Sequence, residues 1–143
     1  MNAASDRIRW FKDIRLEDVP LVGGKTASLG ELYSALSPQG VRVPNGFAVT
    51  AKAYRDALSD AGAWEKLRAL LDWVDKRRIV DLAKRAAEAR AIVYAATDRD
   101  DLRREVEQAY RQLEQEYGAN VAVAVRSSAT AEDLPTASFA GQH

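Results

Sequence analysis

The sequence of 143 residues contains no cysteine and a single histidine, His143. Without cysteine it can form neither a disulfide nor a thiolate metal site, which fits a reducing compartment. One histidine cannot form a histidine cluster for a metal ion. The sequence also has no Gly-x-Ser-x-Gly motif and no cysteine nucleophile. We therefore expect no metal site and no covalent catalysis from these residues.

The sequence also lacks an excess of either charge and any long apolar run. Lysine plus arginine and aspartate plus glutamate both count 21, whereas a nucleic-acid binder usually has a basic excess. No stretch approaches the ~18–20 apolar residues of a membrane span, and residues 1–9 lack the apolar core of a secretory signal. We expect a soluble, cytoplasmic protein of one-domain size, with neither nucleic acid nor membrane as a partner.

The first half of the chain alternates helical and extended patterns. Apolar residues at helical spacing follow Lys25, and Pro38 and Gly40 end that helix. Residues 47–50 then predict a short buried strand. Its last residue, Thr50, is suited to cap the next helix.

The second half is predicted to be helical up to residue 117 and extended beyond it. Apolar stripes over residues 64–117 predict three core-facing helices, the last opened by a capping box of Asp98 and Asp101. The β-branched run at residues 121–125 predicts a buried strand, followed by a polar loop at 129–135. Helices interleaved with strands predict a mixed α/β or α+β fold.

The first candidate site is the run Gly23-Gly24-Lys25-Thr26. It resembles the end of a P-loop, but Val19 stands where that motif requires glycine. Two glycines and a lysine remain at the start of a helix, where free N–H groups, the helix dipole and a mobile charge suit phosphate. The alternative is a glycine turn with a solvated lysine.

The second candidate site follows the predicted strand at residues 121–125. Arg126, Ser127 and Ser128 would lie at its carboxyl end, where α/β folds bind ligands, and arginine recognises phosphate through a two-pronged donor geometry. The loop continues with Thr130, Glu132 and Asp133. The two acidic residues could contact a magnesium ion, or form a solvated turn and pair with Arg126.

Taken together, four segments resemble the phosphoenolpyruvate synthase family, namely WFK at 10–12, LVGGKTASLGE at 21–31, VPNGFAVT at 43–50 and VRSSATAEDLPTASFAGQ at 125–142. Pyruvate phosphate dikinases are similar but usually have glycine where this chain has Ser128. Rifampin phosphotransferases share the stretch from Arg126 to Asp133 and are the closer alternative.

The resemblance implies that residues 1–143 are part of an ATP-binding domain, the N-terminal lobe of an ATP-grasp-like fold with a helical middle segment. It implies ATP with Mg²⁺ as ligands, and phosphate contacts from Lys25, Arg126 and the backbone of Gly141. Supporting contacts would come from Gly23, Gly24, Ser127, Ser128, Thr130, Glu132 and Asp133. The second lobe, the phosphohistidine domain and the barrel would be absent, and His143 would not be the phosphate carrier.

The implied reaction converts ATP, pyruvate and water into AMP, phosphoenolpyruvate and phosphate through a phosphohistidine. The partners would be ATP, pyruvate and the remaining domains of the same polypeptide, with a homo-oligomer left open. The 143-residue chain alone is predicted to be inactive. The alternatives are a rifampin phosphotransferase-like enzyme, a stand-alone nucleotide-binding module without catalysis, and a structural domain.

Overall fold

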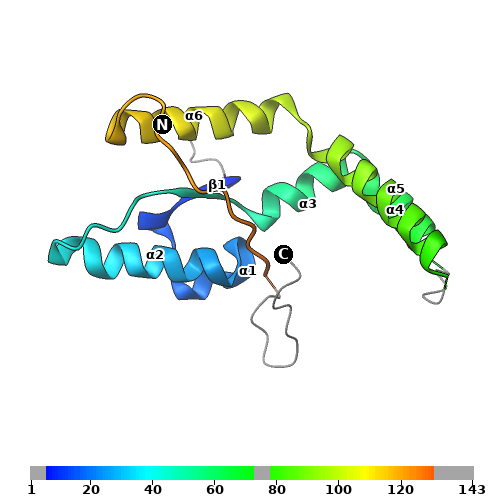
Figure 1. The fold of residues 1–143 in the computed structure, drawn as a ribbon, viewed down its shortest axis with the longest axis horizontal. Coiled ribbons are helices and arrows are strands. Elements are labelled where there is room, and N and C mark those ends of the chain that lie inside the picture. The colour runs from blue at the N-terminus through cyan, green and yellow to red at the C-terminus, as the bar shows by residue number, and fades with distance from the viewer. Residues whose placement is uncertain (1–5, 73–77, 131–143) are drawn as a thin grey trace. The chain divides into compact units, whose positions relative to one another are not determined.

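The computed structural model describes residues 6–72 and 78–130 (Figure 1). They fall into two compact units, with boundaries inside helices α3 (Ala51–Asp60) and α6 (Asp100–Tyr117). The sheet unit comprises residues 6–53 and 104–130 of the described chain, and the helical unit comprises residues 54–103. Helices in both units and a small sheet in the first confirm the mixed α and β class.

The sheet has two antiparallel strands, β1 (Ile8–Trp10) and β2 (Phe47–Val49). Trp10 lies opposite Phe47, and their ring centroids are 5.5 Å apart. The predicted strand at residues 47–50 is thus confirmed as β2, although Val49 is 45% exposed, so the strand is buried only in part. The pairing brings the N-terminal segment against residues that lie about 40 positions later in the sequence.

The core of the sheet unit is centred on Ile14, which is completely buried between two 3-10 turns, η1 (Phe11–Asp13) and η2 (Leu16–Asp18). Helix α2 (Gly24–Leu36) packs against both turns. It ends at Leu36, just before the predicted stop at Pro38 and Gly40, and is followed by a 3-10 turn, η3 (Ser37–Gln39). The other members of this core are Val22 and Ala27, with Phe11, Val19, Leu21 and Ala48 packed around them.

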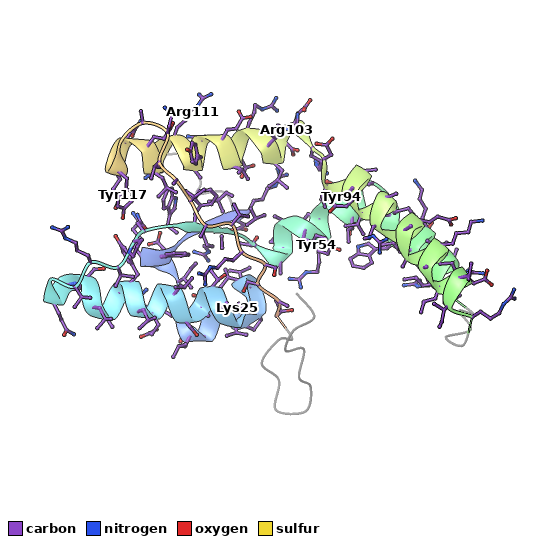
Figure 2. All side chains as sticks on the ribbon, viewed as in Figure 1. Lys25, Tyr54, Tyr94, Arg103, Arg111 and Tyr117 are labelled. Atoms are coloured by element: carbon purple, nitrogen blue, oxygen red, sulfur yellow. The ribbon has the colours of Figure 1, made fainter. Side chains whose placement is uncertain are left out.

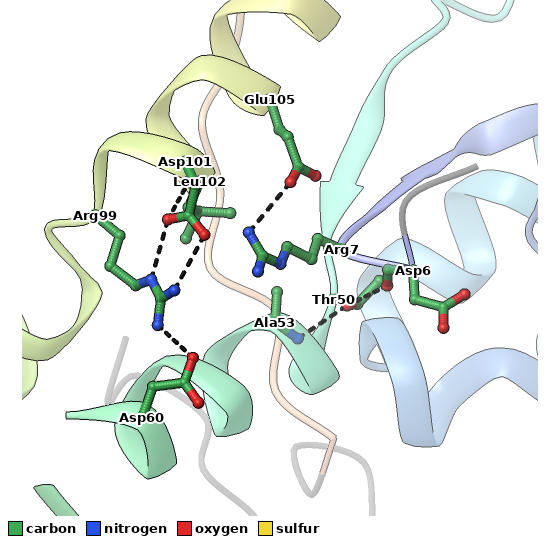
Figure 3. Close-up of polar contacts among 9 residues, drawn as sticks. All are labelled: Asp6, Arg7, Thr50, Ala53, Asp60, Arg99, Asp101, Leu102 and Glu105. Carbon is green, nitrogen blue, oxygen red and sulfur yellow. Dashed lines mark hydrogen bonds and ion pairs between the residues drawn. The ribbon is translucent and has the colours of Figure 1, made fainter. Parts of the chain in front are cut away.

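Thr50 caps α3 as predicted and also joins it to the N-terminal segment (Figure 3). Its Oγ1 accepts a hydrogen bond from the Ala53 N–H at 3.2 Å and donates one to the Asp6 carbonyl at 2.8 Å. Next to Asp6, the Arg7 guanidinium pairs with Glu105 of α6 at 3.2 Å. Thr50 is only 1% exposed, and its two hydrogen bonds offset the burial of its hydroxyl.

The helical unit contains the hairpin of α4 (Ala63–Leu71) and α5 (Ile79–Thr97). Its core cluster consists of the buried residues Leu58, Ala63 and Ala96. The expectation that α5 faces a core along its length is wrong at its start, where Ile79 is 77% exposed. The physical reason is that the described residues form a core around the end of α5 and not around its first turn.

The predicted capping box of Asp98 and Asp101 is also wrong, because α6 begins two residues after Asp98 and arginines take both carboxylates. Arg99 donates to Asp101 through Nε at 3.0 Å and to Asp60 through Nη1 (Figure 3), while Arg103 pairs with Asp98. The hydrogen bonds that Arg99 donates to Asp101 and then to Asp60 raise its already high pKa. The Asp98 carboxylate thus pairs with an arginine side chain, while that of Asp101 pairs with Arg99 and also accepts the Leu102 N–H at 3.0 Å.

The predicted buried strand at residues 121–125 is not formed. Val123 is 49% exposed and Val125 is 93% exposed. A strand requires a neighbour that pairs with its N–H and C=O groups, and β1 and β2 pair only with each other among the described residues. The segment is held instead by a hydrogen bond from the Tyr110 hydroxyl to the Val121 carbonyl at 2.8 Å.

In the described part of the chain, none of the helices is long and apolar enough to cross a membrane.

The packing of α2 on Ile14 leads to a test at Gly30. A Cβ atom added at Gly30 would lie 2.6 Å from the Cβ of Ile14. Gly30→Ala should gain about 1 kcal/mol from helix propensity but lose about 1–3 kcal/mol through overpacking. We expect a lower free energy of unfolding in urea. Ser28→Ala, at an exposed position of the same helix, should change it by less than about 0.5 kcal/mol. A more stable Gly30→Ala variant would contradict this packing.

Candidate phosphate-binding site

Gly23 makes the turn between the short helix α1 (Val19–Val22) and α2. Its N–H closes α1 on the Val19 carbonyl at 2.9 Å, and its carbonyl accepts the N–H of Ala27 at 3.0 Å to open α2. Its φ of 80° and ψ of 161° lie in a region open almost only to glycine. The first predicted glycine is therefore required by the backbone.

Lys25 lies in the first turn of α2 with an exposed side chain (Figure 2). Gly24 beside it is buried and is the first residue of the helix. The helix N-terminus carries a partial positive charge, which adds to the ammonium group of Lys25. This confirms the predicted position of the lysine at the start of a helix, and it gives the site two sources of positive charge.

Arg126 and Ser127 lie in the extended segment that returns from α6, and both are exposed, as is Thr130. Ser128 is half-buried. Because no strand forms at residues 121–125, the expectation that Arg126 lies at a strand end is wrong in the described structure. The segment is positioned by side-chain hydrogen bonds rather than by a sheet ladder.

The structure brings the two candidate motifs together at Ser128. The Thr26 N–H donates to the Ser128 Oγ at 3.4 Å across 102 positions of sequence. A Cβ atom added at Gly23 would collide with that Oγ and lie 2.9 Å from the Ser128 carbonyl carbon and 3.0 Å from the Ala129 nitrogen. The glycine turn therefore receives the Ser128 backbone at close range.

Thr26 belongs to the first candidate run, but sequence reasoning gave it no role of its own, and it takes part through its backbone N–H rather than its side chain. Its position in the first turn of a helix was the available signal, since such N–H groups have no partner within the helix. Glu132, Asp133 and Gly141 were also predicted as site residues, and they lie outside the described residues. Within residues 6–72 and 78–130, no group of three metal-ligating side chains could hold an ion.

A second group of contacts fixes the loop before β2 to the end of α6. The Asn45 backbone N–H donates to the Tyr117 hydroxyl at 2.8 Å, and the Asn45 side-chain amide donates to Glu116 at 2.8 Å. Partial burial raises the pKa of Tyr117, so its hydroxyl stays protonated at neutral pH. These contacts hold α6, from which the segment carrying Arg126 departs.

Residues 19–143 match the family described as the pyruvate phosphate dikinase AMP/ATP-binding domain. The chain is 48% identical over 136 residues to a phosphoenolpyruvate synthase of Helicobacter pylori, an alignment that covers 94% of the chain and 17% of that protein. It is 46% identical over 140 residues to a phosphoenolpyruvate synthase of Neisseria meningitidis, covering 97% of the chain and 18% of that protein. The Escherichia coli phosphoenolpyruvate synthase is 43% identical over 141 residues, covering 99% of the chain and 18% of that protein. The chain thus spans less than a fifth of the length of these curated relatives.

The exposure of residue 125 can be tested in the 143-residue chain. Val125→Ser should change the free energy of unfolding by less than about 0.5 kcal/mol, because the side chain is 93% exposed. The matched control is Leu113→Ala in α6, which is 5% exposed and should cost about 2–5 kcal/mol. Urea unfolding measures both. A loss at Val125 comparable to that at Leu113 would mean that the segment is buried.

Proposed function

The chain belongs to the family of pyruvate phosphate dikinase AMP/ATP-binding domains, and on this premise we propose that it is the ATP-binding portion of a phosphoenolpyruvate synthase. The proposed reaction of the full-length polypeptide converts ATP, pyruvate and water into AMP, phosphoenolpyruvate and phosphate. The curated relatives carry the name of that enzyme and support the assignment. We assign the phosphohistidine and the pyruvate site to other domains of the same polypeptide, since the chain spans 17% of the first of these relatives.

The observation that carries the proposal is the meeting of the two candidate motifs. Ser128 contacts both Gly23 and Thr26, and we call this contact the Ser128 joint. Lys25 and Arg126 each lie within two residues of a residue that forms it. Cations on both sides of such a joint suit a polyphosphate, whose charge is spread over several oxygens. We therefore propose that Lys25 and Arg126 hold the ATP phosphates, in one lobe of an ATP-grasp-like fold.

The two cations would contribute differently. Phosphoryl transfer requires little covalent work from the protein, so catalysis depends on positioning and charge stabilisation. Arg126 can engage two phosphate oxygens through its planar fork, whereas Lys25 supplies a point charge on a flexible stem. A donor that follows the charge developing on the oxygens stabilises the transition state more than the ground state. We accordingly expect Arg126 to stabilise the transition state more than Lys25 does.

Magnesium is a further part of the proposal. The described residues offer no cluster of three acidic or histidine side chains for an ion. The ion would therefore reach this site on the ATP phosphates, which are its usual ligands in such enzymes. Glu132 and Asp133, together with the backbone of Gly141, stay predictions for this site. A cytoplasmic location stays a prediction for the protein, and a homo-oligomer stays open.

The role of Arg126 is tested by substitution in the full-length polypeptide. Arg126→Ala should lower kcat for AMP release by on the order of 10²–10³, as loss of one charge-stabilising donor does. Arg126→Lys should recover little of it, because the two-pronged geometry is lost. Lys25→Arg should keep more activity than Lys25→Ala.

The matched control is Arg111→Ala, which removes an exposed arginine from α6 (Figure 2) and should leave kcat unchanged. Thermal melts of all variants should agree with the wild type, since neither Lys25 nor Arg126 is buried. Near-wild-type kcat and KM for ATP in Arg126→Ala would remove the arginine from the phosphate site.

The acceptor distinguishes a phosphoenolpyruvate synthase from a rifampin phosphotransferase. We expect the full-length polypeptide to release AMP and phosphoenolpyruvate when ATP is supplied with pyruvate, and to leave rifampin unmodified. The 143-residue chain, assayed in parallel, should form no phosphoenolpyruvate. ATP consumption with rifampin but not with pyruvate would show that the synthase assignment is wrong.

A further inference from the structure

Helix α2 begins without a cap of its own. Its N-cap residue is Gly23, and no side chain at that position accepts a hydrogen bond. The first N–H groups of a helix have no partner within the helix, and an N-cap serine, threonine or aspartate normally accepts from the second or third of them. Glycine cannot do so, which leaves this task to another residue.

Ser128 performs the task from 102 residues away. Its Oγ accepts from the N–H of Thr26, the third residue of α2, which is the donor that an N-cap serine would satisfy. The hydroxyl occupies the space where a side chain at Gly23 would begin. The backbone angles of Gly23 exclude other residues almost completely, so a local cap and this distant cap cannot coexist.

We propose that Ser128 is a positioning residue for ATP binding. Through this distant cap, Ser128 holds Arg126 beside the start of α2. The inference rests on the proposed role of Arg126 and Lys25 as phosphate ligands. Ser128 lies two residues after Arg126, and two residues of chain span at most about 7 Å. Lys25 is adjacent to Thr26, the other partner of the hydrogen bond. The backbones of both cations therefore start within two residues of one fixed point.

This arrangement reduces the freedom that ATP binding would otherwise have to remove. The described segment before Arg126 makes no strand and Val125 is almost fully exposed, so the sheet does not hold the arginine. Side chains and loops that are ordered only on binding reduce affinity, and groups fixed beforehand avoid that loss. Ser128 thus acts on ATP through Arg126 and not by its own contact.

The experiment is a double-mutant cycle on ATP affinity, measured by calorimetry on the full-length polypeptide. Ser128→Ala should weaken ATP binding about 2- to 10-fold, the effect of one hydrogen bond. In an Arg126→Ala background it should have almost no further effect, because the group that it positions is gone. Ser28→Ala, which removes an exposed serine from the same helix, should leave the affinity unchanged.

Gly23→Ala disturbs the contact between Gly23 and Ser128 from the α2 side, and we expect it to weaken ATP binding by on the order of 10-fold or more. If Gly23→Ala fails to fold, the result for Ser128→Ala alone decides whether Ser128 positions Arg126. An unchanged affinity in Ser128→Ala, or an equal loss in both backgrounds, would overturn the positioning role. A fall in the thermal midpoint of Ser128→Ala without loss of affinity would make Ser128 a cap only, and would overturn it too. An unchanged affinity in Arg126→Ala would instead refute the phosphate role on which the inference rests.

Discussion

The contact of Ser128 with the turn at Gly23 joins the segment that follows α6 to the start of α2, and the candidate site depends on it. Gly23 ends one helix, opens the next and leaves space for a hydroxyl from a distant segment. Each of these tasks needs a residue without a side chain. The segment from Val121 to Ser128 is held at its first residue by Tyr110 and at its last by Thr26. Two hydrogen bonds thus replace the ladder that the segment lacks.

The same principle of distant anchoring recurs around the sheet. Thr50 caps α3 in the usual local way, yet its hydroxyl also binds the carbonyl of Asp6. Tyr117, at the end of α6, accepts from the backbone of Asn45. With two strands of three residues each among the described residues, the sheet by itself would be marginal. Side chains that reach across the sequence supply the connections that a larger sheet would provide through its backbone.

Features that depend on neighbouring residues could be predicted from the sequence. Helix α2 with its glycine and proline stop, strand β2 and the Thr50 cap are set by signals within a few positions. Strand β1 (Ile8–Trp10) could not be predicted in the same way, because it forms by pairing with β2, whose residues lie about 40 positions later in the sequence. The contact between Thr26 and Ser128 could not be predicted from the sequence for a related reason, since no local pattern encodes a pair 102 positions apart.

The failures at residues 121–125 and at the start of α5 have one cause. In both, an apolar pattern stated correctly what the side chains prefer, but burial also requires a partner. Val125 and Ile79 remain 93% and 77% exposed in the described structure. The candidate site depends on such a segment, because Arg126 follows Val125 directly. An arginine on an unpaired segment can engage phosphate reproducibly only if something else fixes its backbone. Ser128 is the described residue nearest to Arg126 with a hydrogen bond to α2. The position of Arg126 therefore depends on the Ser128 hydroxyl and on the space left by Gly23, rather than on the sheet.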